Sequence, residues 1–415
     1  MASAGGSTTR MSVGFDLPYE VRRQWPEEWD LSPCLLGEAA RPPGQGPMRY
    51  LHEALEVRAL PGRGRGVVAT RPVEAGELVM LDTPLMTAES YGVLVEELTS
   101  RTRDDEAFRR QVLSMCGDPA DVAARSQQDR PPSTALVQNI VRHNYHGAEP
   151  MPRDGEVKSA EVFGLWPLGS LLNHSLKPNV ARTFAGECSC YRSIKPLQVG
   201  DEVLDNYLDL RLPAAMRKDM MRKNHGIDDE GPDACDAPAA FVAEVRDAHQ
   251  RAMAQLMEDG GTQSASQAAF VELAQLTNRC ADSGVKDPAF CDIFRDFAQL
   301  AGQLGDANMS LQGFALAVEM ATAREPFSTI SYLLALRMVH MAVLAKDEVG
   351  AETRGGLEAL ARRHFRIVFG SAPGAFEAAN PQLVADLVAR PEAATAAAGE
   401  DRGAPADCAK RSRTS

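Results

Sequence analysis

The chain has 415 residues, of which 44% are hydrophobic and 24% are charged, as is typical of a globular protein. This length is sufficient for two or three domains. Lys and Arg number 44 against 57 Asp and Glu, which gives a formal net charge of −13. A chain this acidic cannot bind nucleic acid through its net field, and its charge would instead favour a basic protein segment as partner.

Cysteine usage and the first residues bear on the compartment. None of the eight cysteines forms a CxxC pair, so we expect free thiols in a reducing compartment, cytoplasmic or nuclear. The start, MASAGGSTTR, has no apolar core, and no apolar run approaches 18 residues. This predicts a protein that is neither secreted through a signal peptide nor inserted in a membrane. The acid-free start leaves a fragment of an organellar transit peptide as an alternative.

The first half alternates between irregular, β-prone and helical segments. Residues 1–50 are rich in Pro, Gly and Trp without a sustained period, so we expect an irregular extension. Short β-prone runs between Gly and Pro follow in 51–92. Residues 93–142 are helical and charged in pattern, and β-like pieces resume from about 161 to 210. The β-rich part therefore comes in two pieces, 51–92 and 136–210, with helices between them.

The second half has a helical pattern throughout. After Pro213, apolar residues recur at helical spacing. The expected helices span 241–256, 266–281, 288–304, 308–323, 329–346 and 357–369. Gly260-Gly261 and Gly370 are expected to end helices, and Ser328 to cap one. Such spacing suggests a helical bundle or a TPR-like array, although no TPR consensus repeat is legible. From about 392 the Ala/Gly/charge-rich composition predicts disorder.

The segment PGRGRGVVAT, residues 61–70, places glycines at 62, 64 and 66. Glycine permits unusual φ angles and lets a ligand approach the backbone closely. Neither GxGxxG nor GxxxxGK[ST] is present, so a dinucleotide fingerprint and a P-loop are both excluded. A tight hairpin without a ligand remains an alternative.

Two polar segments follow apolar runs. WPLGSLLNHSLKPNV, residues 166–180, passes from leucines to Asn173-His174-Ser175, and buried polar side chains must find partners. The turn is therefore either an internal hydrogen-bonded knot or a ligand site. In VGDEVLDNYLDL, residues 199–210, Gly200 marks a turn, Asp201-Glu202 supplies charge, and Tyr207 is expected in a strand. A strand tyrosine is most often a packing residue.

In this order, ATRPVEAGELV after the Gly-rich turn, LLNHSLKPNV and GDEVLDNYLD resemble the SET-domain protein lysine methyltransferases. The sequence is most similar to the branch in which a helical insertion splits the SET domain and a TPR-like domain follows, the SET-and-MYND proteins. The Rubisco large-subunit methyltransferase branch is the second placement. The resemblance implies an α+β fold, with a split, knot-like, β-rich SET domain before an all-α domain. The implied parts are an extension (1–50), SET pieces (51–92 and 136–212), an insertion (93–135), a degenerate post-SET-like segment (213–237), a helical domain (238–392) and a tail (393–415).

The resemblance also implies an activity and a set of site residues. Members of this family transfer methyl from S-adenosyl-L-methionine to a lysine of a histone or non-histone protein. By resemblance, the cofactor is held by Arg63, Gly64, Arg65, Gly66, Asn144, Ser170, Asn173, His174 and Ile227. Tyr207 is the implied catalytic residue at the lysine channel. We expect a monomer with a protein substrate and without membrane contact.

Three departures from the family pattern qualify these expectations. Leu176 stands where the SET-and-MYND branch has a zinc-binding Cys, and the downstream segment keeps only Cys235, so we expect no metal there. The insertion contains only Cys116, which excludes a MYND finger. Ile227 replaces the usual aromatic against adenine. A catalytically inactive protein-binding module is therefore the alternative function, and a structural α+β protein with fortuitous motifs is a third.

Overall fold

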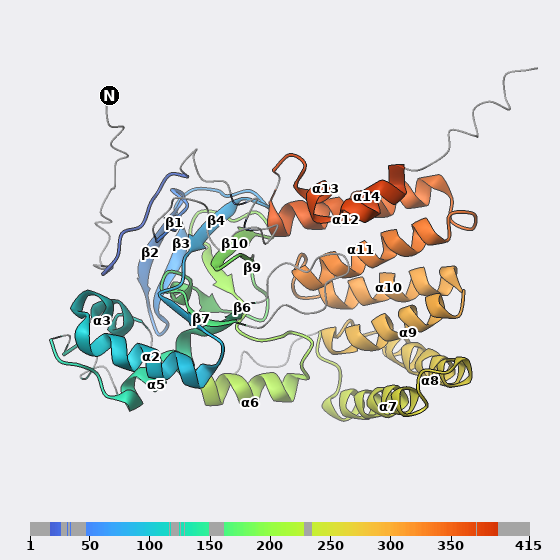
Figure 1. Ribbon diagram of the computed structural model, residues 1–415, viewed down its shortest axis with the longest axis horizontal. Helices are drawn as coiled ribbons and strands as arrows, with labels where there is room; N and C mark the ends of the chain where they lie inside the picture. Colours follow the sequence, from blue (N-terminus) through green and yellow to red (C-terminus); the bar gives the residue numbers. More distant parts are fainter. Residues whose placement is uncertain are drawn as a thin grey trace, which may run out of the picture.

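The structure is a computed structural model that describes residues 17–25, 31, 34, 47–115, 117, 124, 126–127, 129–148, 162–227, 235–370 and 372–388. Most of the expected N-terminal extension, Cys116 and the whole expected tail (393–415) lie outside these residues. A β-rich half and a helical half lie side by side (Figure 1).

Three small sheets build the β-rich half. Their hydrogen-bonded orders are β1-β4-β10-β9, β2-β3-β11-β8 and β5-β7-β6. The strands are β1 (Arg49–Leu51), β2 (Leu55–Leu60), β3 (Gly64–Ala69), β4 (Leu78–Asp82), β5 (Met86–Ala88), β6 (Tyr145–Ala148), β7 (Val162–Leu165), β8 (Asn173–His174), β9 (Val180–Ala185), β10 (Cys188–Ser193) and β11 (Glu202–Asp205). All the pairings are antiparallel except that of β8 with β11. The second sheet thus joins segments from both β-rich pieces of the sequence.

The apolar run before Asn173 enters the core between the first two sheets. Leu168, Leu171 and Leu172 are buried there with Tyr191 and Val203. A 3-10 turn, η2 (Gly169–Leu171), carries the run to β8. Burial of these leucines fixes where the following polar residues emerge, because each leucine stabilises the fold by about 2 kcal/mol when removed from water.

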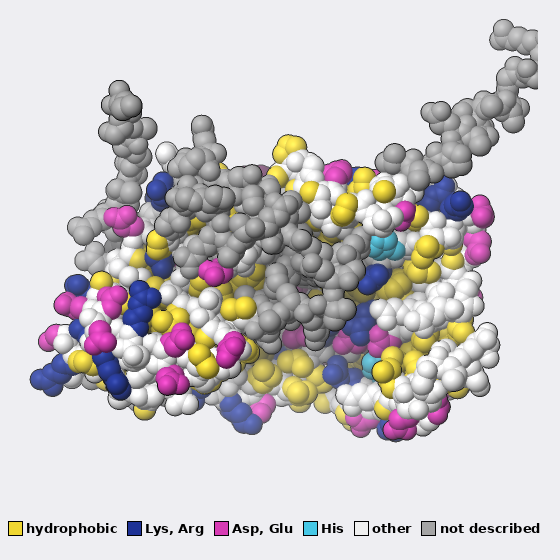
Figure 2. Space-filling view, viewed as in Figure 1, with side chains coloured by type: hydrophobic (Ala, Val, Ile, Leu, Met, Phe, Trp, Pro, Cys, Tyr) yellow, Lys and Arg dark blue, Asp and Glu magenta, His cyan; other side chains and the backbone are white. Residues whose placement is uncertain are grey.

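The helical insertion packs on the third sheet. It contains α2 (Tyr91–Asp104), α3 (Glu106–Leu113) and α5 (Thr134–Asn144), and Ser90, Asp105 and Ser133 cap the three N-termini. Leu94, Leu98 and Ile140 bury the inner face. The outer surface carries charges of both signs (Figure 2), including the i,i+4 pairs Arg101–Asp105 and Arg110–Glu106. The expected boundary at 135/136 falls inside α5, and β6 begins earlier than the β-like pieces expected from about 161.

The helices of the second half stack in sequence order, from α7 at one end to α12 at the other (Figure 1). They are α6 (Ala214–His225), α7 (Ala239–Glu258), α8 (Gln263–Asp282), the 3-10 turn η3 (Pro288–Phe290), α9 (Cys291–Gln303), α10 (Ala307–Thr322), α11 (Thr329–Leu344), α12 (Ala351–Phe369), α13 (Ala375–Ala379) and α14 (Pro381–Val388). All six expected helices are present, and Ser328 caps α11 as expected. Helix α12 starts six residues before its expected start because it tolerates Gly355 and Gly356.

Two apolar clusters hold the helical half together and join it to the β-rich half. One contains Phe290, Phe294 and Phe314 within the stack. The other packs aromatic residues of α11 and α12, Tyr332 and Phe365 among them, against residues of β1, β4 and β10. This shared core fixes the two halves relative to each other. Among the described residues, no helix is long and apolar enough to cross a membrane.

Candidate active site

The β2–β3 hairpin presents an open backbone. Gly62 and Gly64 have φ of +72° and +74°, a region that side chains avoid, and a Cβ at either would meet no atom within 4 Å. Gly66 differs, because its Cβ would overlap the Leu60 side chain and would lie 2.9 Å from Asn173 Nδ2 and 3.0 Å from Glu202 Oε1. The first two glycines therefore shape the turn, and the third permits a close approach of Asn173. The unusual φ angles expected from the sequence occur at Gly62 and Gly64, whereas the close approach at Gly66 is made by side chains of the protein itself.

Asn173 joins the hairpin to β11. The short strand β8 runs parallel to β11, with Asn173 opposite Leu204 and His174 opposite Asp205. The Asn173 Nδ2 group donates to the carbonyl oxygen of Arg65 (3.0 Å) and to Glu202 Oε1 (2.7 Å). Since both bonds use the amide nitrogen, the amide oxygen of this half-buried side chain is the group that remains to face a ligand.

A second asparagine closes the segment around β11. Asn179 Nδ2 donates to the Glu202 carbonyl oxygen (2.7 Å), and Asn179 Oδ1 accepts from the Leu204 N–H (2.8 Å). The Ser175 N–H donates to the Asp205 carbonyl oxygen (2.9 Å). The polar turn that the sequence left open is thus an internal hydrogen-bonded structure as well as a candidate ligand site. We call residues 173–179 together with β11 the knot.

Tyr207 lies beyond the end of β11 and not within a strand, which corrects the expectation from sequence. Its N–H donates to His174 Nδ1 (3.2 Å), and its hydroxyl donates to the Leu172 carbonyl oxygen. The ring centroid lies 5.2 Å from that of His174 and 4.9 Å from that of His225. Burial, with the nearby positive charge of Arg142 and His143 in support, lowers the pKa of His225 to about 4. The imidazole of His225 that contacts the Tyr207 ring is therefore uncharged at neutral pH.

The two arginines of the hairpin tie it to its surroundings. Arg63 donates to Glu202 Oε2 (3.0 Å) and to the His174 carbonyl oxygen (2.9 Å). Arg65 donates to the Ser114 carbonyl oxygen at the end of α3. The structure thus brings together six of the expected cofactor residues: Arg63, Gly64, Arg65, Gly66, Asn173 and His174.

The other three expected cofactor residues have different surroundings. Asn144 is buried at the end of α5, where its Nδ2 donates to the Ile140 carbonyl oxygen (2.7 Å). The Ser170 hydroxyl donates to the Pro167 carbonyl oxygen (2.8 Å). These bonds hold both side chains against their own turns. Ile227, just after α6, is 38% exposed and lines a small pocket together with His174.

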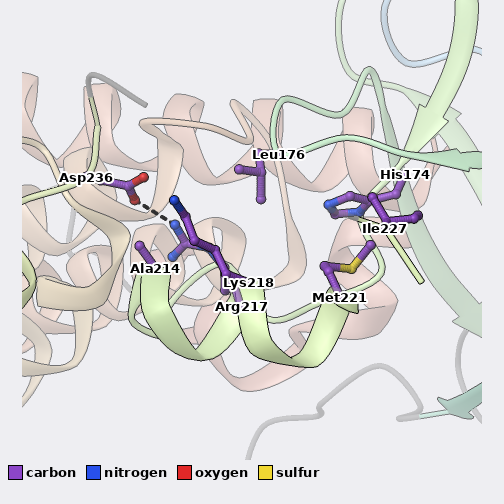
Figure 3. A pocket seen from close by; sticks show the side chains of 8 residues that line it. All are labelled: His174, Leu176, Ala214, Arg217, Lys218, Met221, Ile227 and Asp236. Carbon is purple, nitrogen blue, oxygen red and sulfur yellow. Dashed lines mark hydrogen bonds and ion pairs between the residues drawn. The ribbon is translucent and has the colours of Figure 1, made fainter. Parts of the chain in front are cut away.

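A small pocket lies beside Leu176 and the start of the segment 213–237 (Figure 3). In the family pattern, zinc-binding cysteines occur in this region. The pocket has room for about 20 Å³ and is lined by His174, Leu176, Ala214, Arg217, Lys218, Met221, Ile227 and Asp236. Leu176 is 6% exposed. An apolar side chain therefore fills the position of the absent Cys ligand. Within the described ranges, no three His, Cys, Asp or Glu side chains are placed to hold a metal ion.

Buried ion pairs join the segments that meet beside Leu176. Arg217 of α6 and Arg324, after α10, both donate to Asp236 Oδ1, at 2.6 and 2.5 Å. Burial acts to raise the pKa of Asp236, but Arg324 and Arg217 hold that pKa below its usual range. We call this cluster the Asp236 junction. Sequence reasoning missed it because the three residues are far apart in the chain.

Another carboxylate supports the approach to the knot. Asp82, fully buried at the end of β4, accepts from the N–H groups of Leu168 (2.6 Å) and Gly169 (3.2 Å) and pairs with Arg49 (3.1 Å). Burial raises the pKa of Asp82 to about 6, against the lowering effect of Arg49. Its position inside an apolar strand gave no functional signal in the sequence.

A cleft of about 510 Å³ opens beside Tyr207 between the two halves of the molecule. One wall comes from β6, β9 and the segment after β11, and the other from the start of α11, the preceding loop and Phe369. Its volume lies in the range of ligand-binding clefts. Arg182 on the first wall donates to Asp205 Oδ2 (2.8 Å). A molecule in this cleft would contact Tyr207 directly.

Comparison with known proteins assigns the β-rich half. The family profile "SET domain" matches residues 64–208. N-lysine methyltransferase SMYD2 of Gallus gallus is 32% identical over 95 residues, which are 23% of this chain and 21% of that protein. Histone-lysine N-methyltransferase set5 of Schizosaccharomyces pombe is 24% identical over 182 residues, 43% of this chain and 49% of that protein. The chain thus spans between a fifth and a half of the length of these relatives.

A solved structure titled "Crystal structure of the SET domain of LSMT bound to Lysine and AdoHcy" also matches. It has a TM-score of 0.28 and 11% identity, over 81% of this chain and 87% of that one.

The matched residues run from Gly64, at the start of β3 in the hairpin, through the knot to Tyr207, so this part of the chain is similar to SET domains. Its sequence matches to SMYD2 and set5 relate it to the SMYD branch of the SET-domain lysine methyltransferases. The predicted family and the predicted α+β fold with a helical C-terminal half are confirmed.

Proposed function

We propose that the protein is an S-adenosyl-L-methionine-dependent protein-lysine N-methyltransferase, whose substrate is a lysine of a histone or non-histone protein. The observation that carries this proposal is the hydrogen-bonded convergence of the hairpin backbone, Asn173, His174 and Tyr207, the last of which also lines the cleft. The relatives' printed names, which describe lysine methyltransferases, support the reaction class.

The residues present fit the amino-acid end of the cofactor. The space over Gly62 and Gly64 is open, and the Asn173 amide oxygen is placed to accept from an ammonium group. Arg63 beside Glu202 supplies a positive group for a carboxylate. On the other side, the pocket at Ile227 is small and contains no Phe, Tyr or Trp side chain, which predicts a weak adenine contact. S-adenosyl-L-methionine, when bound, supplies a methyl group on a sulfonium that is already a good leaving group.

The chain's own contribution is alignment and a dry channel. The Tyr207 ring lies between the rings of His174 and His225, and its hydroxyl is fixed on the Leu172 carbonyl oxygen. This arrangement can orient an amine and exclude water. A desolvated channel also disfavours the lysine ammonium, so the lysine reaches the reacting position in its neutral, nucleophilic form.

A non-catalytic SET and helical-repeat module that binds a protein partner is the second candidate. The exposed Ile227 and the small pocket beside it favour this alternative. A thermal-shift titration with S-adenosyl-L-methionine and with its demethylated product separates the two. We expect stabilisation that grows with ligand concentration, because a ligand of the native state raises its stability. No shift up to millimolar ligand would exclude the enzyme.

The Tyr207→Phe variant tests the catalytic assignment. We expect it to retain the thermal shift and to lose at least about tenfold of methyl transfer to a bulk protein substrate, a modest loss for one positioning hydroxyl. Asp219→Ala, at an exposed position of α6, is the matched control and should transfer normally. Transfer by Tyr207→Phe at the control rate would remove Tyr207 from its role.

Other features remain proposals beside this activity. We place the SET pieces at 51–92 and 136–212, the insertion at 93–135, the post-SET-like segment at 213–237 and a TPR-like domain at 238–392. The protein would act as a monomer in the cytoplasm, the nucleus or both. The free thiols of the described cysteines are consistent with such a reducing compartment.

A further inference from the structure

The charges that line the cleft beside Tyr207 are not balanced. Three carboxyl groups, those of Asp205, Asp209 and Glu325, face two guanidinium groups, those of Arg182 and Arg211. Arg182 pairs with Asp205 (2.8 Å), and Arg211 pairs with Asp209 (2.7 Å). Arg211 also reaches Asp292 (3.2 Å). Both cations of the cleft are therefore already engaged by other carboxylates.

Glu325 is the carboxyl group of the cleft that takes no part in these ion pairs. In the part of the chain that the structure describes, it has no ion pair and no side-chain hydrogen bond. It is half-buried in the cleft wall. Burial first, and then the negative Asp205, raise the pKa of Glu325 to about 8, with Asp209 adding to this effect and Arg182 opposing it. A positive group placed in the cleft would favour the ionised form of Glu325 and so counteract both burial and the repulsion from Asp205.

The loop that carries Glu325 is held on both sides. The preceding residue, Arg324, is buried and donates to Asp236 in the Asp236 junction. The following residues, Pro326 and Ser328, lead into α11, which Ser328 starts with a reciprocal capping box with Ser331. Glu325 therefore stands on a fixed support, as a recognition residue requires.

We infer that Glu325 recognises a second cationic side chain, a lysine or arginine, that flanks the target lysine of the protein substrate. This inference rests on the proposed methyltransferase function and adds a substrate class to it. The carboxylate supplies a charge-assisted hydrogen bond in a cleft that shares Tyr207 with the reacting centre. A neutral flanking residue would leave Glu325 without a partner.

A peptide library with a fixed central lysine and randomised flanks tests the inference. With S-adenosyl-L-methionine as methyl donor, we expect the wild-type protein to prefer Lys or Arg at one flanking position. Glu325→Gln should lower kcat/KM for that cationic peptide about tenfold, the size of a lost charged hydrogen bond, and leave the neutral-flank peptide unchanged. Glu325→Lys should turn the preference towards Asp or Glu. The matched control is Glu319→Gln. Glu319 is a carboxylate on α10 that pairs with Lys286.

Peptide binding without turnover supplies a second measurement. The affinity ratio of an arginine-flanked to a neutral-flanked peptide should rise from pH 7 to above pH 8, as Glu325 ionises, and this rise should vanish in Glu325→Gln. Transfer with no flanking preference, or the same preference in wild type and Glu325→Gln, would overturn the inference and leave the proposed function standing. Absence of transfer to any peptide or protein would count against the proposed function and, with it, this inference.

Discussion

The knot and the Asp236 junction both fasten distant segments around the candidate site, but they do so with different chemistry. In the knot, Asn173 and Asn179 bond to backbone groups and to Glu202 over distances of 2.7–3.0 Å. In the Asp236 junction, one carboxylate serves two buried guanidinium groups from α6 and from the loop after α10. Neutral amides that complete a strand ladder depend on local register, whereas the ion pairs depend on charges that tertiary packing alone brings together.

The segments beside Leu176 correspond to those that carry zinc-binding cysteines in the SET-and-MYND pattern, and here apolar packing and ion pairs connect them. Leu176 and His174 both line the small pocket (Figure 3), and Arg217 and Arg324 both pair with Asp236. A zinc site would tie the same segments by coordination, which needs its full set of donors. Apolar packing and ion pairs tolerate gradual replacement. The two regions should therefore respond differently to mutation, acid and chelators.

The largest expected effect is on the Asp236 junction. Asp236→Ala removes the acceptor shared by Arg217 and Arg324, whose side chains are 3% and 0% exposed. Breaking a buried ion pair from one side typically destabilises by about 3–5 kcal/mol, because the remaining charges stay buried. Urea unfolding followed by circular dichroism measures this loss.

Two controls accompany the Asp236→Ala measurement. Asp219→Ala removes an exposed carboxylate that also pairs with two cations of α6, and it should leave the urea midpoint unchanged. A zinc chelator should leave wild-type unfolding unchanged, and elemental analysis should find no tightly bound ion. One zinc per chain, or equal effects of the two substitutions, would contradict the role given to these ion pairs.

A fall in pH should change the contributions of Asp82 and Asp236 to folding stability in opposite directions. Asp82 supports the segment that leads into the knot. Because the folded-state pKa of Asp82 is raised to about 6, the folded protein binds a proton more readily than the unfolded chain between about pH 4 and 6. Its contribution is present below pH 4 and is lost as the pH rises through 6, by about 3 kcal/mol. The lowered pKa of Asp236 acts oppositely, since its contribution is lost as the pH falls.

Unfolding free energies of wild type and Asp82→Asn, measured at several pH values, test whether the contribution of Asp82 to stability falls as the pH rises. The difference between the two proteins should change by the stated amount between pH 4 and 6 and be flat above pH 7. A parallel pair of curves would show that Asp82 titrates alike in the folded and unfolded chains.

The smallest expected effect separates two glycines of the hairpin. Gly66→Ala forces a Cβ against the side chains of Leu60, Asn173 and Glu202 and should destabilise by about 1–3 kcal/mol. It should also abolish the thermal shift with S-adenosyl-L-methionine. Gly64→Ala meets no neighbour, and its positive φ costs about 1 kcal/mol, so the thermal shift should persist. Loss of the shift in both variants would mean that hairpin conformation, and not the contact with Asn173, controls binding.

Local patterns predicted much of the fold. Helical periodicity located α7 to α12, and Ser328 and the Gly-rich segment marked a cap and a hairpin correctly. Helix α12 begins six residues before the start expected from its apolar face, and Tyr207 lies beyond the strand that ends at Asp205. Such boundaries depend on tertiary contacts, which outweigh propensities of about 1 kcal/mol per residue.

The amino-acid sequence alone indicated the family motifs, the interruption of the β-rich part by helices and the helical second half. Each is encoded by residues that are neighbours in the chain or that recur at a fixed period. The tertiary structure was needed to show three features. Glu202 accepts a hydrogen bond from Asn173, Arg217 and Arg324 both pair with Asp236, and Glu325 lines the cleft without an ion-pair partner among the described residues. Whether two charged groups pair depends on the distance between them in space and on how far their surroundings exclude water. Neither the distance nor the exclusion of water can be read from the positions of the residues in the sequence.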